Sequence, residues 1–231
     1  MPQANIFRWR AGTGWMILAG GGAPDSDDNF NIEAGMLTRT VSQGPIAYVW
    51  AAGDIETADR HMDALRDLGA RTGYLIDILT EDDESLQREL SEAGVIILGD
   101  GPRTTTLRDA LVGVSWRAIE ESFNRGATLY IVGRSAAIIG AHMLPDAENT
   151  EVEDHTLRAG AGWLADALIV PRYTPDQADA LRAHVARLPA GGYGLGIAEG
   201  AALAFGPNST VEVWGNAKIT VSLGSSYDSG V

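Results

Sequence analysis

The stretch Thr128-Leu129-Tyr130-Ile131-Val132 leads directly into Gly133-Arg134-Ser135-Ala136-Ala137. A short run of apolar and β-branched residues that ends at a glycine is typical of a buried strand. The tight turn that follows carries a serine and continues into an apolar helical pattern as far as His142. The sequence therefore predicts a strand–turn–helix unit at this point.

Similar units precede this one in the chain. Strands are expected at 46–52, 74–79 and 95–98, and a helix is expected between the first two of them. That helix is marked by apolar residues at helical spacing: Ile55, Ala58, Met62, Leu65 and Leu68. Continuous apolar strands that alternate with helices predict a mostly parallel sheet covered on both faces, which is a three-layer α/β sandwich.

Such sheets bind ligands at the carboxyl ends of their strands. Three glycine-bearing turns are expected at these ends, at 20–22, 99–101 and 133–137. After Gly194 the pattern changes to short strands without helices between them, which predicts an antiparallel C-terminal extension. No internal repeat or linker interrupts the chain, so residues 1–231 are expected to form a single domain.

The composition excludes several classes of function. The 231-residue chain has no cysteine, which rules out disulfides, thiolate metal sites and cysteine nucleophiles. Its formal charge of −14 disfavours nucleic-acid binding, because that function needs a basic face. The negative charge is explained either by solubility or by a pocket that attracts cationic substrates. No apolar run approaches the roughly 18 residues of a membrane span, so a cytoplasmic protein without membrane contact is expected.

The serine turn has two interpretations. A turn of this kind can be a nucleophile elbow, which exposes a serine hydroxyl above a helix N-terminus whose amides stabilise an oxyanion. The pattern G-x-S-x-G is imperfect here, because Ala137 occupies the last position. On this motif alone, the preferred interpretation is that Ser135 is the N-cap of the following helix.

Several segments, in the same order along the chain, resemble peptidase family S51, which includes aspartyl dipeptidase and cyanophycinase. Residues 133–137 resemble the G-[ST]-S-A-G turn of that family, and 95–101 resemble its strand that ends in Gly-Gly-Asp/Asn. Residues 194–203 are similar to its G-[IL]-G-I-D-E-x-x-A-L segment, and 160–173 to its G-x-G-x-L…D-x-H-F segment. The resemblance therefore implies a flavodoxin-like, mostly parallel sheet related to that of class I glutamine amidotransferases.

The resemblance implies a Ser-His-Asp/Glu triad that acts on peptide or isopeptide bonds next to aspartate. Ser135 would attack the carbonyl, and the amides of Ala136 and of Gly101 or Asp100 would hold the oxyanion. No cofactor and no metal are expected, because the turn at 20–22 lacks the spacing of a dinucleotide fingerprint and no His/Asp/Glu cluster has the spacing of a metal site. The resemblance is compatible with a homodimer. The expected partner is a small peptide or an acidic small molecule.

The sequence departs from the family pattern at the catalytic histidine, where it has Arg172. Arginine stays protonated in proteins and cannot take a proton from a serine. His155 is the best replacement base, whereas His61 is expected on the surface. Glu153 is the candidate acid, with Glu148 and Glu151 as alternatives in the same acidic loop.

Two functions remain open at this point. The first is an S51-like serine hydrolase that uses Ser135 and a rearranged base. The second is a catalytically inactive family member that binds an acidic ligand or partner in the same cleft. Arginine suits carboxylates because its guanidinium binds them in a bidentate fork, so the candidate binding residues are Arg172, Arg134 and Arg103.

Overall fold

The computed structural model describes residues 6–23, 26–146 and 156–224. The helices are α1 (Asp27–Arg39), α2 (Ile55–Asp67), α3 (Asp83–Glu92), α4 (Thr104–Leu111), α5 (Val114–Asn124) and α6 (Ala178–Val185), with short 3-10 helices η1 (Gly133–Ile139), η3 (Pro175–Gln177) and η4 (Pro207–Ser209). The strands are β1 (Met16–Ala19), β2 (Ile46–Val49), β3 (Gly73–Ile76), β4 (Val95–Leu98), β5 (Thr128–Val132), β6 (Gly140–Met143), β7 (Arg158–Ala159), β8 (Leu164–Pro171), β9 (Tyr193–Ile197), β10 (Ala201–Gly206), β11 (Thr210–Gly215) and β12 (Ile219–Leu223).

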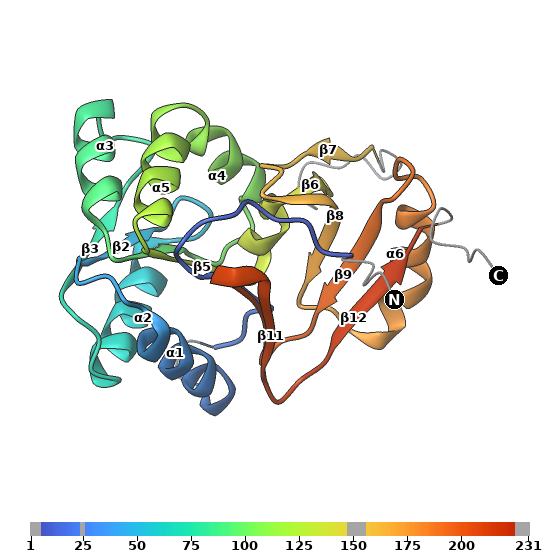
Figure 1. Cartoon of the computed structure of the whole chain (residues 1–231), viewed down its shortest axis with the longest axis horizontal. Coiled ribbons are helices and arrows are strands. Elements are labelled where there is room, and N and C mark those ends of the chain that lie inside the picture. Colours follow the sequence, from blue (N-terminus) through green and yellow to red (C-terminus); the bar gives the residue numbers. More distant parts are fainter. Residues whose placement is uncertain (1–5, 24–25, 147–155, 225–231) are drawn as a thin grey trace.

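The larger sheet has the strand order β11-β10-β1-β5-β4-β2-β3. Strands β1, β5, β4, β2 and β3 are mutually parallel, and β10 and β11 add an antiparallel edge. Helices cover both faces, as Figure 1 shows with α1 and α2 on one side and α3 and α5 on the other. The predicted three-layer α/β fold with a mostly parallel sheet is confirmed.

The side chains of β4 show why this sheet needs two helical layers. Ile96 and Leu98 belong to the core beneath α3 and α5, whereas Val95 and Ile97 belong to the core beneath α1 and α2. Successive side chains of a strand point to opposite faces, so a strand without polar residues must be covered twice. The apolar runs of the sequence therefore encode the layered arrangement directly.

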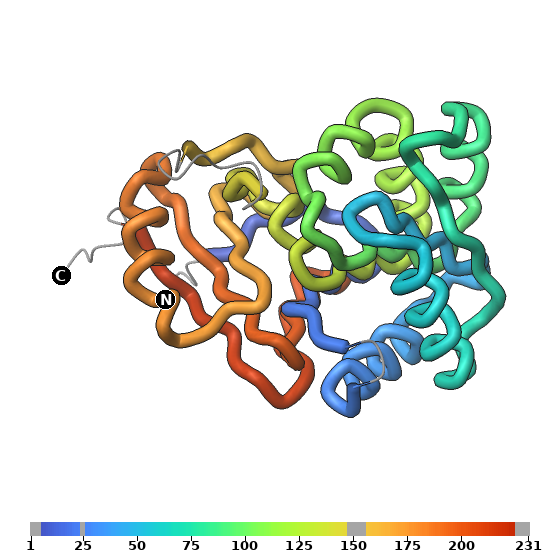
Figure 2. The backbone as a smooth tube through the Cα atoms, turned by 180° about the vertical axis from the view of Figure 1, so that it is seen from behind, coloured from blue at the N-terminus to red at the C-terminus, as the bar shows by residue number. Residues whose placement is uncertain are grey.

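A second sheet has the order β12-β9-β8-β6-β7, and α6 packs against it. Figure 2 shows it from behind as a separate lobe beside the larger sheet. The expected antiparallel ending is confirmed in the β10–β11 and β9–β12 pairs. The sequence did not predict that strands from the middle of the chain, β6 and β8, form a sheet of their own with the C-terminal strands.

Two sequence expectations are corrected by the structure. The segment after β5 is not an α-helix that extends to His142, because η1 ends at Ile139 and the chain turns at Gly140 into β6, where His142 lies. His61 is not on the surface, since its exposed fraction is 2%.

Over the described ranges, none of the helices has the length and apolar character needed to cross a membrane.

Candidate functional site

The turn between β5 and η1 lies at the carboxyl edge of the parallel sheet, where the fold class places ligands. Its strained residue is Gly133, which has a φ of +57°. In a nucleophile elbow the nucleophile itself occupies the strained position of the turn. By backbone geometry the elbow position of this chain is therefore Gly133, two residues before the serine.

Ser135 lies one turn further on and points into the protein. Its exposed fraction is 0%, and its hydroxyl donates a hydrogen bond of 2.5 Å to the backbone carbonyl of Gly99. The expectation that this hydroxyl projects from the edge of the sheet is wrong. In this conformation Ser135 connects η1 to the end of β4, and its oxygen is not accessible to a substrate.

Asp100 follows β4 and places its carboxylate directly over the elbow. The backbone N–H of Arg134 donates to Asp100 Oδ1 at 2.8 Å. A Cβ at position 133 would lie 2.3 Å from Asp100 Cγ, so only glycine fits beneath the carboxylate. In acyl-transfer enzymes the amide that follows the nucleophile holds the oxyanion, and here the corresponding amide is bonded to a side chain of the protein.

Arg172 approaches the elbow from the end of β8. Its guanidinium forms an ion pair with Asp100 and lies 3.5 Å from the Glu199 carboxylate. Its backbone has a φ of +52° and its N–H donates to the Gly20 carbonyl at 3.1 Å. The side chain that the resemblance aligns with the catalytic histidine is thus a permanent cation that already contacts two carboxylates.

The remaining predicted site residues are distributed around this turn. Ala136 is buried in η1. Gly101 packs against the backbone of Ala52, and the Arg103 guanidinium donates to the Gly53 carbonyl. The candidate base His155 and the candidate acid Glu153, with its alternatives Glu148 and Glu151, lie outside the described residues.

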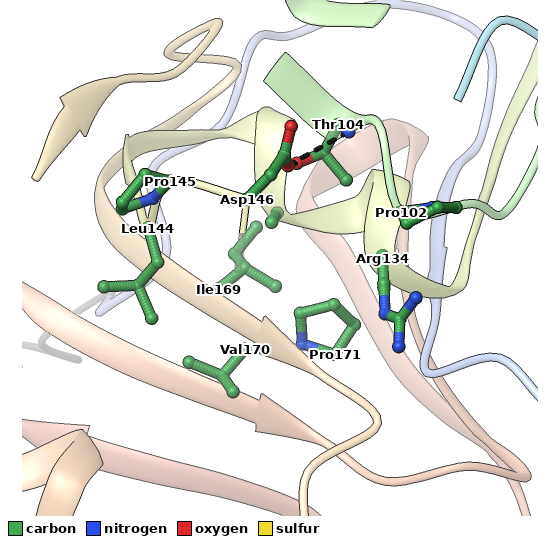
Figure 3. Close-up of a pocket in the computed structure, with 10 residues that line it drawn as sticks. Pro102, Thr104, Arg134, Leu144, Pro145, Asp146, Ile169, Val170 and Pro171 are labelled. Carbon is green, nitrogen blue, oxygen red and sulfur yellow. Dashed lines mark hydrogen bonds between the residues drawn. The ribbon is translucent and has the colours of Figure 1, made fainter. Parts of the chain in front are cut away.

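A cavity of about 260 Å³, here named the elbow cavity, opens on one side of the turn (Figure 3). Its walls are mainly apolar and include Leu144, Ile169 and Pro171. Arg134 is exposed at this cavity, and no ion pair to its guanidinium is found among the described residues. On the opposite wall, Asp146 accepts the N–H groups of Thr104 and Thr105 and thereby caps α4.

A second cavity of about 260 Å³, here named the tyrosine cavity, opens on the α1 and α2 side of the turn. It is lined by Asp100, Arg172 and Glu199 and, opposite them, by Tyr48 and His61. The ion pair between Asp100 and Arg172 thus forms part of its wall. The elbow lies between two cavities, one lined by Arg134 and several apolar side chains and one lined by the Asp100–Arg172 ion pair, Tyr48 and His61.

Behind the tyrosine cavity lies a buried hydrogen-bonded network that the sequence analysis missed. His61 Nε2 is 2.7 Å from Glu33 Oε1, and His61 Nδ1 is 3.1 Å from the Tyr48 hydroxyl. The Tyr130 hydroxyl donates to the same Glu33 oxygen at 3.4 Å. A signal for His61 was present, because it shares the helical face of Ala58, Met62 and Leu65, which is the buried face of α2.

The electrostatics of this network are negative. Burial, followed by the charges of Asp100, Glu33 and Asp54, raises the pKa of Tyr48 above its ordinary value. Burial and the Glu33 charge likewise raise the pKa of Tyr130. Both hydroxyls therefore keep their protons through the physiological range. In the part of the chain that the structure describes, no three His, Asp or Glu side chains are grouped to hold a metal ion.

Comparison with known proteins adds information at the level of the fold. The sequence matches no protein-family model and no curated protein. A crystal structure of a peptidase from an acI-B1 Actinobacterium is similar with a TM-score of 0.70 at 20% identity, covering 92% of each chain. A candidate Peptidase E from Listeria monocytogenes EGD-e is similar with a TM-score of 0.60 at 15% identity, covering 88% of this chain and 99% of the other. The chain therefore has a peptidase-like fold.

Proposed function

We propose that this protein is a non-hydrolytic variant of the peptidase fold that binds an acidic small ligand in the elbow cavity. One observation carries the proposal: the strained elbow position is Gly133, and the carboxylate of Asp100 lies against it. Covalent catalysis at this turn needs a nucleophilic side chain at the elbow, and glycine has none.

The surroundings of Gly133 support the same conclusion. The Arg134 amide, which would stabilise an oxyanion, is bonded to Asp100, and a carboxylate there would repel the negative charge of a tetrahedral intermediate. Arg172 occupies the family position of the general base and cannot accept a proton. At this turn, therefore, the elbow residue has no nucleophile, the family position of the base holds Arg172, and the amide that would hold the oxyanion is bonded to Asp100.

Arg134 supports the assignment of an acidic ligand. It is exposed at the mouth of a cavity with apolar walls, and the other arginine at the turn, Arg172, is held by Asp100 and Glu199. A guanidinium without an ion pair among the described residues, beside a mainly apolar pocket, suits a ligand with a carboxylate and a small apolar body. An Asp-containing dipeptide is one such molecule.

The competing function is an S51-like serine hydrolase that acts through Ser135 on Asp-containing peptide or isopeptide bonds. The likeness in fold to solved peptidases favours it. This function requires η1 to rearrange so that the Ser135 hydroxyl leaves the Gly99 carbonyl and becomes exposed. It also requires a base, for which His155 with Glu153 as the acid is the candidate.

A fluorophosphonate probe and the dipeptide Asp-Leu separate these functions. We expect no labelling of Ser135 and no release of leucine, together with saturable binding of Asp-Leu by calorimetry. Arg134→Gln should weaken that binding about tenfold or more, as expected when a charge-assisted hydrogen bond is lost. The matched control is Arg117→Gln, since Arg117 is exposed on α5 away from the elbow cavity.

Labelling or hydrolysis that disappears in Ser135→Ala would establish the hydrolase and refute the proposal. Binding that is equally strong in Arg134→Gln would refute the assignment of Arg134. Neither Ser135→Ala nor Arg134→Gln removes a buried charge, so the circular dichroism spectra of both variants are expected to match that of the wild type.

A further inference from the structure

The tyrosine cavity is a second site, and its chemistry follows from the direction of its hydrogen bonds. Glu33 has an exposed fraction of 1%, and as a carboxylate it only accepts hydrogen bonds. We assign the proton of this 2.7 Å contact to its partner, His61 Nε2. In a neutral imidazole the other nitrogen, Nδ1, is then an acceptor.

This arrangement orients the Tyr48 hydroxyl. Because His61 Nδ1 accepts, the Tyr48 O–H donates to it across 3.1 Å. The hydroxyl proton is thus engaged inside the protein, and the lone pairs of the Tyr48 oxygen remain for the cavity that Tyr48 lines. The Glu33–His61 pair therefore leaves the Tyr48 oxygen as a hydrogen-bond acceptor for a ligand in the tyrosine cavity.

The other polar groups of the cavity wall also present acceptors. The Thr57 hydroxyl donates to the Asp54 carboxylate at 3.0 Å, and the Asn29 amide donates to the Ala23 carbonyl at 2.8 Å. The terminal nitrogens of Arg172 contact Asp100 and Glu199, and its Nε is a buried donor without a partner among the described residues. The other residues of the lining carry carboxylate, amide and phenol oxygens.

The charged groups around the cavity also favour a cationic ligand. Asp100 and Glu199 line it, and Asp54 lies at the adjacent N-terminus of α2. The cations nearby are Arg172 and Arg60, whose guanidinium donates to the Thr57 hydroxyl at 3.2 Å. Asp100, Glu33 and Asp54 all raise the pKa of Tyr48, which indicates a negative potential at its hydroxyl.

We propose that the tyrosine cavity binds a small organic cation with a primary ammonium group, which donates to Tyr48 and to the carboxylates of Asp100 and Glu199. An ammonium has three donors and no acceptor, so its chemistry suits the phenol oxygen and the two carboxylates among the lining residues. The site lies at the carboxyl edge of the parallel sheet, where this fold class binds ligands. It is independent of the acidic-ligand site at Arg134, which is on the other side of the elbow.

The probe is n-butylammonium, with butyrate at the same ionic strength as the control of opposite charge. The imidazole ¹⁵N resonances of His61, assigned by their loss in His61→Gln, report on the cavity. We expect them to shift saturably with n-butylammonium and to stay unchanged with butyrate. Tyr48→Phe keeps the ring and removes the acceptor oxygen, and it should weaken binding about tenfold or more.

Glu199→Gln provides a second test that does not depend on a core residue, because the Glu199 side chain is half-exposed. It should also weaken n-butylammonium binding, whereas the matched surface change Glu84→Gln on α3 should not. Arg134→Gln should leave this binding intact, so failure of the acidic-ligand proposal would not affect the result.

Three outcomes would overturn the inference. The first is tighter binding of butyrate than of n-butylammonium, which would mean that His61 is an imidazolium and Tyr48 donates into the cavity. The second is wild-type affinity in both Tyr48→Phe and Glu199→Gln. The third is an equal loss in Glu84→Gln, which would show only a general attraction to an acidic protein.

Discussion

The carboxylate of Asp100 fills the space that a side chain at Gly133 would need. A Cβ at position 133 would lie 2.3 Å from Asp100 Cγ, while Asp100 Oδ1 accepts the next backbone N–H, that of Arg134, at 2.8 Å. The Asp100 carboxylate can occupy this place only because residue 133 has no side chain. A serine at the elbow cannot be accommodated unless Asp100 moves or is replaced.

Replacing Gly133 by alanine should destabilise the protein by more than backbone strain alone. The φ of +57° costs an L-residue about 1–2 kcal/mol, and the overlap with Asp100 adds about 1–3 kcal/mol. Gly162 is the matched control, since it has a φ of +68° with no atom near its Cβ position. Urea unfolding should show a clearly larger loss for Gly133→Ala than for Gly162→Ala, and equal losses would contradict the overlap.

The same relationship predicts non-additivity between positions 100 and 133. Asp100→Ala removes the carboxylate and should allow alanine at 133 to fit, so the double variant should lose less stability than the two single variants combined. Coupling between residues in contact is about 0.5–3 kcal/mol. A double-mutant cycle by urea unfolding measures it, and strictly additive losses would show that the two residues do not interact as described.

Ser135→Ala should behave as the loss of a structural hydrogen bond. The Ser135 hydroxyl donates to the Gly99 carbonyl in a fully buried position, so its removal should lower the free energy of unfolding by about 0.5–1.5 kcal/mol. Ser115 is a matched control, because it is equally buried and its hydroxyl has no partner among the described residues. Ser115→Ala should be neutral or stabilising, and an equal loss in both variants would argue against a role for the Ser135 bond.

The sequence predicted the layers of this fold because they depend on local patterns. The apolar runs that became β2, β4 and β5 need cover on both faces, and the spacing of Ala58, Met62 and Leu65 marks the helix that supplies it. The second sheet was not predictable in this way. It pairs β6 with β8 and β9 with β12, and such long-range pairing leaves no local signal.

The site was only partly predictable for a similar reason. The motif around Ser135 matches a nucleophile turn in its letters, but the elbow is set by where β5 ends, and the backbone turns at Gly133 rather than at the serine. Arg172, which the resemblance aligns with the catalytic histidine, contacts Asp100 at this turn. His61 was misplaced because its polarity was given more weight than its position on the apolar face of α2.

Restoring the histidine of the family pattern should not create a hydrolase. In Arg172→His the base position is filled, but Gly133 still lacks a nucleophile and the Ser135 hydroxyl still donates to Gly99. We expect no fluorophosphonate labelling. Stability should fall at neutral pH, because Asp100 and Glu199 both lose their guanidinium partner. Labelling of Ser135 in this variant would instead show that η1 can open and that only the base is missing.

Stability should also fall on the alkaline side, where the buried tyrosines titrate. Burial raises the pKa of Tyr48 and Tyr130 above their ordinary value of about 10, and raises that of Tyr74 to about 12. Above pH 10 the unfolded chain releases these protons while the folded chain retains them, so the free energy of unfolding decreases as the pH rises. Each fully buried tyrosine contributes a slope of at most about 1.4 kcal/mol per pH unit, and below pH 10 the contribution is complete.

Urea midpoints at pH 9, 10 and 11, with tyrosinate absorbance at 295 nm, measure this slope. Tyr130→Phe removes one of the titrating groups, so its slope between pH 10 and 11 should be shallower than that of the wild type, whatever its stability at pH 7. The expected result follows from the position of Tyr130, whose hydroxyl donates to the buried Glu33 carboxylate and would meet strong repulsion as a phenolate. A wild-type protein with a flat alkaline profile, and tyrosines that all ionise near pH 10 while folded, would mean that the Glu33–His61–Tyr48 network is open to water.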